Sequence, residues 1–167
     1  MIELRRATTD DADWLVELYT ADDVDPFLSP RNPRTREAML ERLAVDPEDG
    51  GVMLIVVDGA RAGAMSFDRT SKPNRIAHLG ALAVHPDFRG RRIADEAARI
   101  FQRHLIFDLG YHRLEMACYG FNERAIAHAE RAGWVREGVK RKAYNLRGEW
   151  QDAVQFAVVR EDLDSST

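Results

Sequence analysis

Residues 82–94 read Leu-Ala-Val-His-Pro-Asp-Phe-Arg-Gly-Arg-Arg-Ile-Ala, an apolar run that stops at a proline, passes through a loop and opens a helix. The first N–H groups of a helix lack intrahelical partners and lie at the positive end of its dipole, so they can hold a phosphate. Gly90 lets the main chain approach a ligand closely. Arg89, Arg91 and Arg92 add donors suited to phosphate oxygens. The segment predicts an anion site, and a basic turn facing water is the alternative.

The periodicity on both sides of this segment predicts an alternation of strands and helices. Asp58-Gly59 is a strong hairpin signal between two of the strands. The expected strands are 2–7, 52–57, 61–68, 75–84, 113–119, 135–146 and 150–159. The expected helices are 10–19, 34–45, 91–110 and 122–132. This order predicts one α/β (α+β) domain over residues 1–161 with a mixed sheet, followed by a frayed tail over residues 162–167.

Three blocks in this order resemble the GNAT superfamily of N-acyltransferases, in its RimJ/RimL-like branch. The matching residues are Val84-His85-Pro86 with Arg89 to Ala94, then Asn122 to Ile126 with Ala132-Gly133-Trp134 and Glu137-Gly138, and finally Ala143-Tyr144, Gly148-Glu149-Trp150 and Asp152. The resemblance covers essentially the whole chain. It implies a GNAT fold, in which helices flank a single mixed, largely antiparallel sheet that is splayed at strand four.

The resemblance also implies acetyl-CoA as co-substrate, no metal, and direct attack of an amine on the thioester. A backbone N–H near Leu82 to Val84 would polarise the thioester carbonyl. The implied coenzyme-binding residues are Leu82, Ala83, Val84, Arg89, Gly90, Arg91, Arg92, Ile93, Ala94 and Asn122. The chain departs from the family twice. Arg92 stands where the motif has glycine, and Ala129 stands where many members carry the tyrosine that protonates the leaving thiolate.

Three residues are catalytic candidates. His78, on strand four, is the first candidate for the base because the ordinary pKa of histidine suits that task, and Glu115 on strand five is the second candidate. A bound water could serve instead, and either side chain could be purely structural. Asn122 resembles the asparagine that bonds the pantetheine arm or a water near the sulfur, although a plain N-cap would explain it equally well.

Acidic and aromatic residues are the candidates for the acceptor site. By the resemblance, the loop between the first two helices and the C-terminal hairpin cover the acceptor. The substrate-binding candidates are Asp22, Asp23, Asp25 and Tyr144. An acidic rim would attract a cationic amine, while simple solvation is the alternative. The run Lys140-Arg141-Lys142 could contact the adenosine phosphate or an acidic acceptor, or could lie on an exposed hairpin.

Composition narrows the function class. The 167 residues, 45% of them hydrophobic, suit one domain, and the longest aliphatic run, Val52 to Val57, is too short to span a membrane. The N-terminus resembles no export signal and Cys118 is the single cysteine, so we expect a cytoplasmic protein. The net charge is −4, made of −7 over residues 1–70 and +3 over residues 71–167, which argues against generic nucleic-acid binding.

The expected function is therefore transfer of an acetyl group from acetyl-CoA to a primary amine, on either a protein N-terminus or a small molecule. Two alternatives stay open. The same fold could take its acyl group from an aminoacyl-tRNA, which would make nucleic acid a partner, or from a carrier protein. The chain could also be a non-catalytic module that binds acyl-CoA. A homodimer is compatible with all three.

Overall fold

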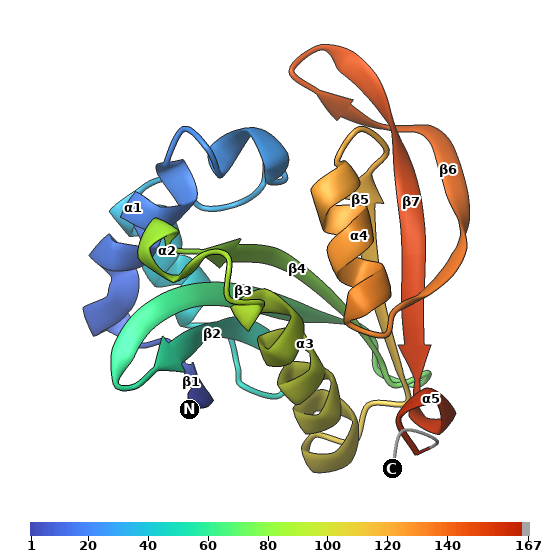
Figure 1. Cartoon of the computed structure of the whole chain (residues 1–167), viewed down its shortest axis with the longest axis horizontal. Coiled ribbons are helices and arrows are strands. Elements are labelled where there is room, and N and C mark those ends of the chain that lie inside the picture. Colours follow the sequence, from blue (N-terminus) through green and yellow to red (C-terminus); the bar gives the residue numbers. More distant parts are fainter. Residues whose placement is uncertain (165–167) are drawn as a thin grey trace. The chain divides into compact units, whose positions relative to one another are not determined.

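The computed structural model describes residues 1–164 and alternates strands and helices almost as predicted (Figure 1). The strands are β1 (Ile2–Arg6), β2 (Gly50–Val57), β3 (Ala60–Ser71), β4 (Ile76–Val84), β5 (Arg113–Tyr119), β6 (Val135–Leu146) and β7 (Glu149–Val159). The helices are η1 (Thr9–Asp11), α1 (Ala12–Thr20), η2 (Asp25–Phe27), α2 (Arg36–Leu43), η3 (Pro86–Phe88), α3 (Ile93–Arg103), η4 (His104–Asp108), α4 (Glu123–Arg131) and α5 (Arg160–Asp164). In hydrogen-bonding order the strands run β1-β2-β3-β4-β5-β7-β6. The predicted mixed sheet is confirmed, because β4 and β5 run parallel while β1-β2, β2-β3, β5-β7 and β6-β7 run antiparallel.

The first of two compact units comprises Met1–Asp68 and Gly80–Ala97. Its core lies between α1, α2 and the strands, and residues from all of them are buried together. The central buried side chains are Leu15, Leu18, Tyr19, Met39, Val52, Leu54 and Ala83.

Asp58 and Gly59 both have positive φ, +48° and +83°, which is the geometry of a tight turn between two strands. The predicted hairpin is thereby confirmed.

An ion cluster ties β1, η1 and β3 together in this unit. Arg5 donates two hydrogen bonds to Asp11, at 2.8 and 2.9 Å, and the Arg61 Nε donates a third at 2.9 Å. The Asp11 side chain is 1% exposed. The bonds from Arg5, supported by the Thr8 amide and Arg61, hold the pKa of the Asp11 carboxyl well below its ordinary value, although burial alone would raise it.

Strand β4 belongs to both units, and its backbone is irregular in the middle. Ala81 has a φ of +51°, a left-handed conformation that interrupts the strand. Residues beyond it stay close to β3, because the His85 amide donates to the Ala62 carbonyl at 2.7 Å. The irregularity expected in strand four is therefore present at Ala81.

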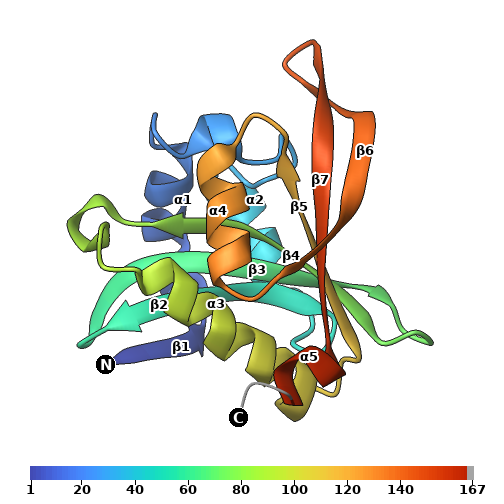
Figure 2. The ribbon, with the colours of Figure 1, turned by 45° about the vertical axis from the view of Figure 1, so that its right-hand side comes forward.

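The second unit comprises Arg69–Leu79 and Ala98–Thr167, of which residues up to 164 are described. The start of β4 pairs with β5 in parallel, and β5 continues to β7 and β6. The long β6–β7 hairpin is prominent in Figure 2. Residues of β5 and β7, including Leu114, Phe156 and Val158, are almost completely buried, and consecutive positions of β7 are buried on both faces of the sheet.

The helix expected over residues 91–110 is shorter than predicted. α3 ends at Arg103, and residues 104–108 form a π-helical turn. The wider turn buries both Leu105 and Ile106, while His104 is half-buried and contacts Asp108 at 2.7 Å. Residues 162–164 of the expected tail form the end of α5, and residues 165–167 lie outside the described residues. Within residues 1–164, no helix is long and apolar enough to cross a membrane.

Candidate functional site

The loop between β4 and α3 has the backbone of a glycine-rich anion site. Gly90 has a φ of +79° and Arg92 a φ of +56°. These two left-handed residues lie within three positions of each other. Backbone of this kind points successive N–H groups to the same side, where they form a concave site that binds anions. A Cβ on Gly90 would meet nothing within 4 Å, so the space beside it is open. Ile93, which begins α3, is buried and anchors the helix start.

Arg92 adopts the conformation that glycine would adopt at this position. The arginine does not impose an ordinary φ on the loop, and its side chain is exposed. A non-glycine residue in this region carries a cost of about 1 kcal/mol. The arginine at position 92 therefore leaves the loop backbone in the left-handed conformation that a glycine would adopt. It also adds a positive charge at the surface beside the loop.

The other loop arginines are held by the protein itself. The Arg89 Nε donates to the Val84 carbonyl at 2.9 Å, and its guanidinium forms an ion pair with Asp23. Arg91 lies over the Phe88 ring, with its guanidinium carbon 5.6 Å from the centroid. These contacts fix the shape of the loop and use part of the donor capacity that the sequence assigned to phosphate.

The preceding strand places Leu82, Ala83 and Val84 directly before this loop. Ala83 is buried in the core, whereas Leu82 and Val84 are half-buried. The Ala81 kink comes immediately before Leu82, so the backbone there departs from a flat strand. On the other side of the loop, Ala94 lies in the first turn of α3 and is half-buried.

The expected acidic rim is partly neutralised. Asp23 pairs with Arg89, and Asp25 pairs with Arg34 at 2.5 Å. Asp22 is exposed. The structure thus joins one coenzyme candidate, Arg89, to one acceptor candidate, Asp23, through a contact between positions 66 residues apart.

His78 and Glu115 are neighbours in the second unit. They are register partners in the parallel pairing of β4 with β5, and both are half-buried. Glu115 accepts a hydrogen bond from the Arg113 Nε at 3.0 Å, and Arg113 also forms an ion pair with Glu137.

Asn122 caps α4. Its side-chain oxygen accepts a hydrogen bond from the Ala125 amide at 3.2 Å, which satisfies one of the unpaired donors of the first turn. Asn122 therefore acts as the N-cap that was the alternative to a contact with the pantetheine arm. The nitrogen of its side-chain amide takes no part in that hydrogen bond. Ala129, on the same helix, is fully buried and offers no proton donor.

The candidates on the β6–β7 hairpin are exposed. The Tyr144 ring meets the Tyr119 ring edge-on at 6.3 Å, and Tyr119 stacks on Phe121 at 5.4 Å. Residues 140–142 lie at an irregularity of β6, where the register shifts between Lys140 and Tyr144. The basic run therefore lies on a bulge of an exposed strand.

Two further features carry no catalytic group. Cys118 is buried, which raises its pKa to about 11 and keeps the thiol protonated and unreactive at neutral pH.

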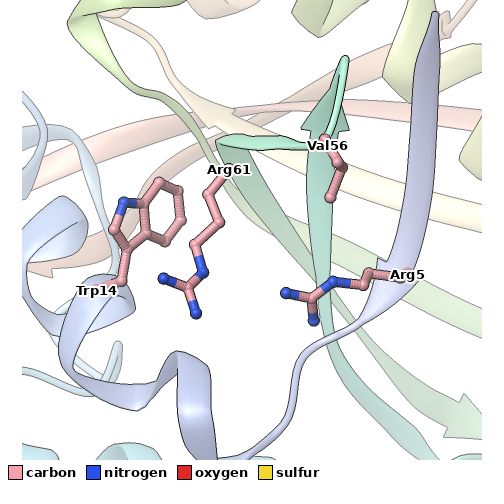
Figure 3. A pocket seen from close by; sticks show the side chains of 5 residues that line it. Arg5, Trp14, Val56 and Arg61 are labelled. Carbon is pink, nitrogen blue, oxygen red and sulfur yellow. The ribbon is translucent and has the colours of Figure 1, made fainter.

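An open pocket of about 470 Å³ is lined by Arg5, Trp14, Val56, Gly59 and Arg61 (Figure 3). Both of its guanidinium groups already bond Asp11, so it is the rim of a structural ion cluster. Within residues 1–164, no group of three His, Cys, Asp or Glu side chains could hold a metal ion.

One residue near the candidate site was not predicted to act there. The Tyr19 hydroxyl, at the end of α1, donates to the Ala81 carbonyl at 2.8 Å. The sequence placed Tyr19 on the apolar stripe of the first helix, and it is indeed 1% exposed. The hydroxyl of Tyr19 was the feature of the sequence that could have indicated this contact, because a buried tyrosine hydroxyl needs a hydrogen-bond partner.

Comparisons with known proteins concern the family and the fold of the chain. The family model described as an acetyltransferase (GNAT) domain matches residues 2–135. The SPbeta prophage-derived uncharacterized N-acetyltransferase YokL of Bacillus subtilis (strain 168) is 30% identical over 99 residues, which are 59% of this chain and 55% of that protein. The chain thus spans about half the length of this curated relative.

Two solved structures have a similar fold. A chimera of the spermidine N-acetyltransferase SpeG from Vibrio cholerae and hSSAT matches with a TM-score of 0.84 at 14% identity, over 97% of each chain. A ribosomal-protein-S5-alanine acetyltransferase from Vibrio fischeri matches with a TM-score of 0.81 at 19% identity, over 97% of this chain and 94% of that chain. At these identities the likeness establishes the fold that the three blocks of sequence predicted.

Proposed function

Because the chain belongs to the GNAT acetyltransferase family, we propose that it transfers the acetyl group of acetyl-CoA to the nitrogen of a primary amine. The observation that carries the proposal is the loop after β4, where Gly90 and Arg92 are left-handed directly before α3. The amides of this loop and of the first turn of α3 are suited to hold the coenzyme pyrophosphate, because the helix dipole favours an anion there. The exposed Arg92 side chain supplies a further cation at the same place.

The transfer itself requires few groups from the protein. The amine nitrogen forms a bond to the acetyl carbon, the carbon–sulfur bond breaks, and the thiolate leaves with the electron pair. The amine loses one proton to His78, to Glu115 or to a water, and the thiolate takes a proton from water because Ala129 supplies none. A backbone N–H beside the Ala81 kink stabilises the charge on the carbonyl oxygen, and Leu82 is the first residue placed to supply it.

We infer that the acceptor is the amine of a protein N-terminus, as the RimJ/RimL-like branch implies. The charges of the α1–α2 loop support this choice over a polyamine. Asp23 and Asp25 are paired with Arg89 and Arg34, so the loop has less negative potential for a polycation than its sequence suggests. The expected compartment is the cytoplasm, where a chain with one buried cysteine needs no disulfide.

Titration calorimetry with acetyl-CoA and with free coenzyme A tests the donor. Gly90→Ala places a side chain on a left-handed residue of the loop, and we expect its coenzyme affinity to fall at least fivefold. Gly59→Ala is the matched control, because Gly59 also has a positive φ and open space but lies in the β2–β3 turn. Equal affinities of the two variants, or native protein that binds no coenzyme, would contradict the assignment of the loop.

An acceptor panel tests the second half of the proposal. Peptides with free N-termini, their N-acetylated counterparts and spermidine are compared at one concentration, with release of coenzyme A as the readout. We expect turnover only of the free peptides. Preferential turnover of spermidine would overturn the N-terminal acceptor while leaving acetyl transfer in place. Coenzyme binding with no turnover of any amine would favour the non-catalytic module.

A further inference from the structure

A buried hydroxyl lies against the peptide next to the candidate oxyanion donor. The Tyr19 hydroxyl donates to the Ala81 carbonyl at 2.8 Å, and both residues belong to the first unit. Tyr19 is 1% exposed and packs in the core between α1 and the strands, so its ring is fixed by its neighbours. Burial raises the pKa of the Tyr19 phenol well above its ordinary value, so the group stays protonated and remains a donor.

Peptide geometry connects this bond to the candidate oxyanion donor. The carbonyl of Ala81 and the N–H of Leu82 belong to one planar trans peptide, and they point in opposite directions. A hydroxyl that holds the Ala81 carbonyl toward α1 therefore directs the Leu82 N–H away from α1. Without such a bond the peptide would be freer to rotate, because the left-handed φ of Ala81 is disfavoured for a residue with a side chain.

The backbone on either side of this peptide is held independently. The Ser66 hydroxyl donates to the Gly80 carbonyl at 3.2 Å. After Leu82, a Cβ on Gly63 would collide with the Ala83 carbonyl oxygen and lie 3.2 Å from the Val84 Cα, which shows how closely β3 approaches this part of β4. The peptide between Ala81 and Leu82 thus lies between two anchored points, and Tyr19 bonds its carbonyl.

We propose that Tyr19 is a positioning residue for acetyl transfer, which acts by holding the Ala81–Leu82 peptide so that the Leu82 N–H faces the acetyl carbonyl. This inference rests on the proposed function. Tyr19 touches neither coenzyme nor amine in this role. Its hydroxyl contributes to the rate of transfer, through the orientation of a donor that must be fixed before reaction begins.

Tyr19→Phe tests the proposal, because it removes the hydroxyl and keeps the ring in the core. We expect kcat to fall 10- to 100-fold, while the KM for acetyl-CoA and the Kd for coenzyme A change less than threefold. Thr20→Val is the matched control. It removes a hydroxyl of the same helix that also donates to a carbonyl, that of Val16, but not to β4. An unchanged kcat in Tyr19→Phe, or a loss equal to that in Thr20→Val, would overturn the proposal.

Amide NMR of the free protein separates this proposal from the proposed function. Tyr19→Phe should shift the Leu82 amide resonance, and Thr20→Val should leave it in place. If native protein acetylates no amine, the proposed function fails, but the resonance still reports whether Tyr19 orients the peptide. In the unaltered protein the Tyr19 hydroxyl proton should exchange slowly with water, and exchange as fast as that of an exposed tyrosine would overturn the proposal without any variant.

Discussion

Two aspartates of the first unit show how the surroundings of a residue set its contribution to stability. Asp11 is buried and bonded by Arg5 and Arg61, whereas Asp58 pairs with the N-terminal amine at the surface. We expect Asp11→Asn to lower the free energy of unfolding by about 3 kcal/mol, because two guanidinium groups lose the charge that they face. Asp58→Asn should cause no measurable change. Denaturant unfolding at neutral pH checks both variants.

The same cluster predicts a dependence of stability on pH. The pKa of Asp11 is lower in the folded chain than in the unfolded chain, so the cluster stabilises the protein above the ordinary carboxyl pKa and loses this effect as pH falls. The difference in unfolding free energy between native protein and Asp11→Asn should shrink from about pH 5 downward. A difference that stays constant down to about pH 2 would mean that Asp11 titrates normally.

At position 92, glycine should stabilise the folded chain more than arginine does, because the backbone there is left-handed. Arg92→Gly removes the cost of a left-handed arginine, and we expect the free energy of unfolding to rise by about 0.5–1 kcal/mol. Arg147→Gly, in the β6–β7 turn at a φ of +52°, should give a similar gain. Only Arg92→Gly should alter the salt dependence of coenzyme affinity, as measured by calorimetry at two salt concentrations, because only Arg92 lies in the loop.

Single residues also mark the limit of sequence reasoning. The sequence correctly placed Gly90 in a loop that opens a helix, and the N-cap that was the alternative for Asn122 is observed, since both features depend on local backbone. It could not show that Arg89 pairs with Asp23 or that Tyr19 bonds Ala81, because these partners are more than 60 positions apart. Contacts of this kind depend on how the elements pack, which no local pattern records.

At the level of elements, the approach of β3 to β4 decides the position of the candidate site. Gly63→Ala should lower the free energy of unfolding by about 2 kcal/mol, because the new methyl group would overlap the Ala83 carbonyl. It should also weaken coenzyme binding, because the end of β4 leads directly into the loop. Gly80→Ala is the control for stability, since a Cβ there meets nothing within 4 Å. Thermal unfolding and coenzyme titration compare the two variants.

Most elements could be predicted because each has a clear period and a clear end. Asp58-Gly59 marks the first hairpin, Pro86 the end of β4, and Gly133 the end of α4. The π-helical turn at 104–108 could not, because it inserts an extra residue into an otherwise regular helix. α5 was also missed, since its five residues are too few to show a helical period.

For the whole molecule, we expect the two compact units to unfold together. Strand β4 and helix α3 each contribute residues to both units, so unfolding of one unit disrupts an element of the other. Trp14 reports on the first unit, and Trp134 and Trp150 report on the second. Tryptophan fluorescence of a Trp14→Phe variant and of a Trp134→Phe/Trp150→Phe double variant should give coincident thermal transitions, and coenzyme A should raise both midpoints equally. Two separated transitions would contradict this prediction.

The fold and the family could be predicted from three short blocks, whereas the acceptor could not. The first block spans the end of β4 and the start of α3, the second spans α4 and the start of β6, and the third lies in the β6–β7 hairpin, so they stand in the order that the resemblance requires. The loop at 22–34, which is only a candidate for the acceptor site, is held by ion pairs of Asp25 with Arg34 and of Asp23 with Arg89. Its charge in the folded protein therefore differs from the charge that its sequence displays.

The protonated state of Cys118 makes the chain convenient for single-site labelling. A maleimide reacts with the thiolate, and a buried thiol with a pKa of about 11 holds almost none of that form at neutral pH. A cysteine introduced by Asp22→Cys on the exposed α1–α2 loop would therefore take up a fluorophore selectively, with the native cysteine left in place. Such a dye could follow acceptor binding directly, in real time and without a coupled assay.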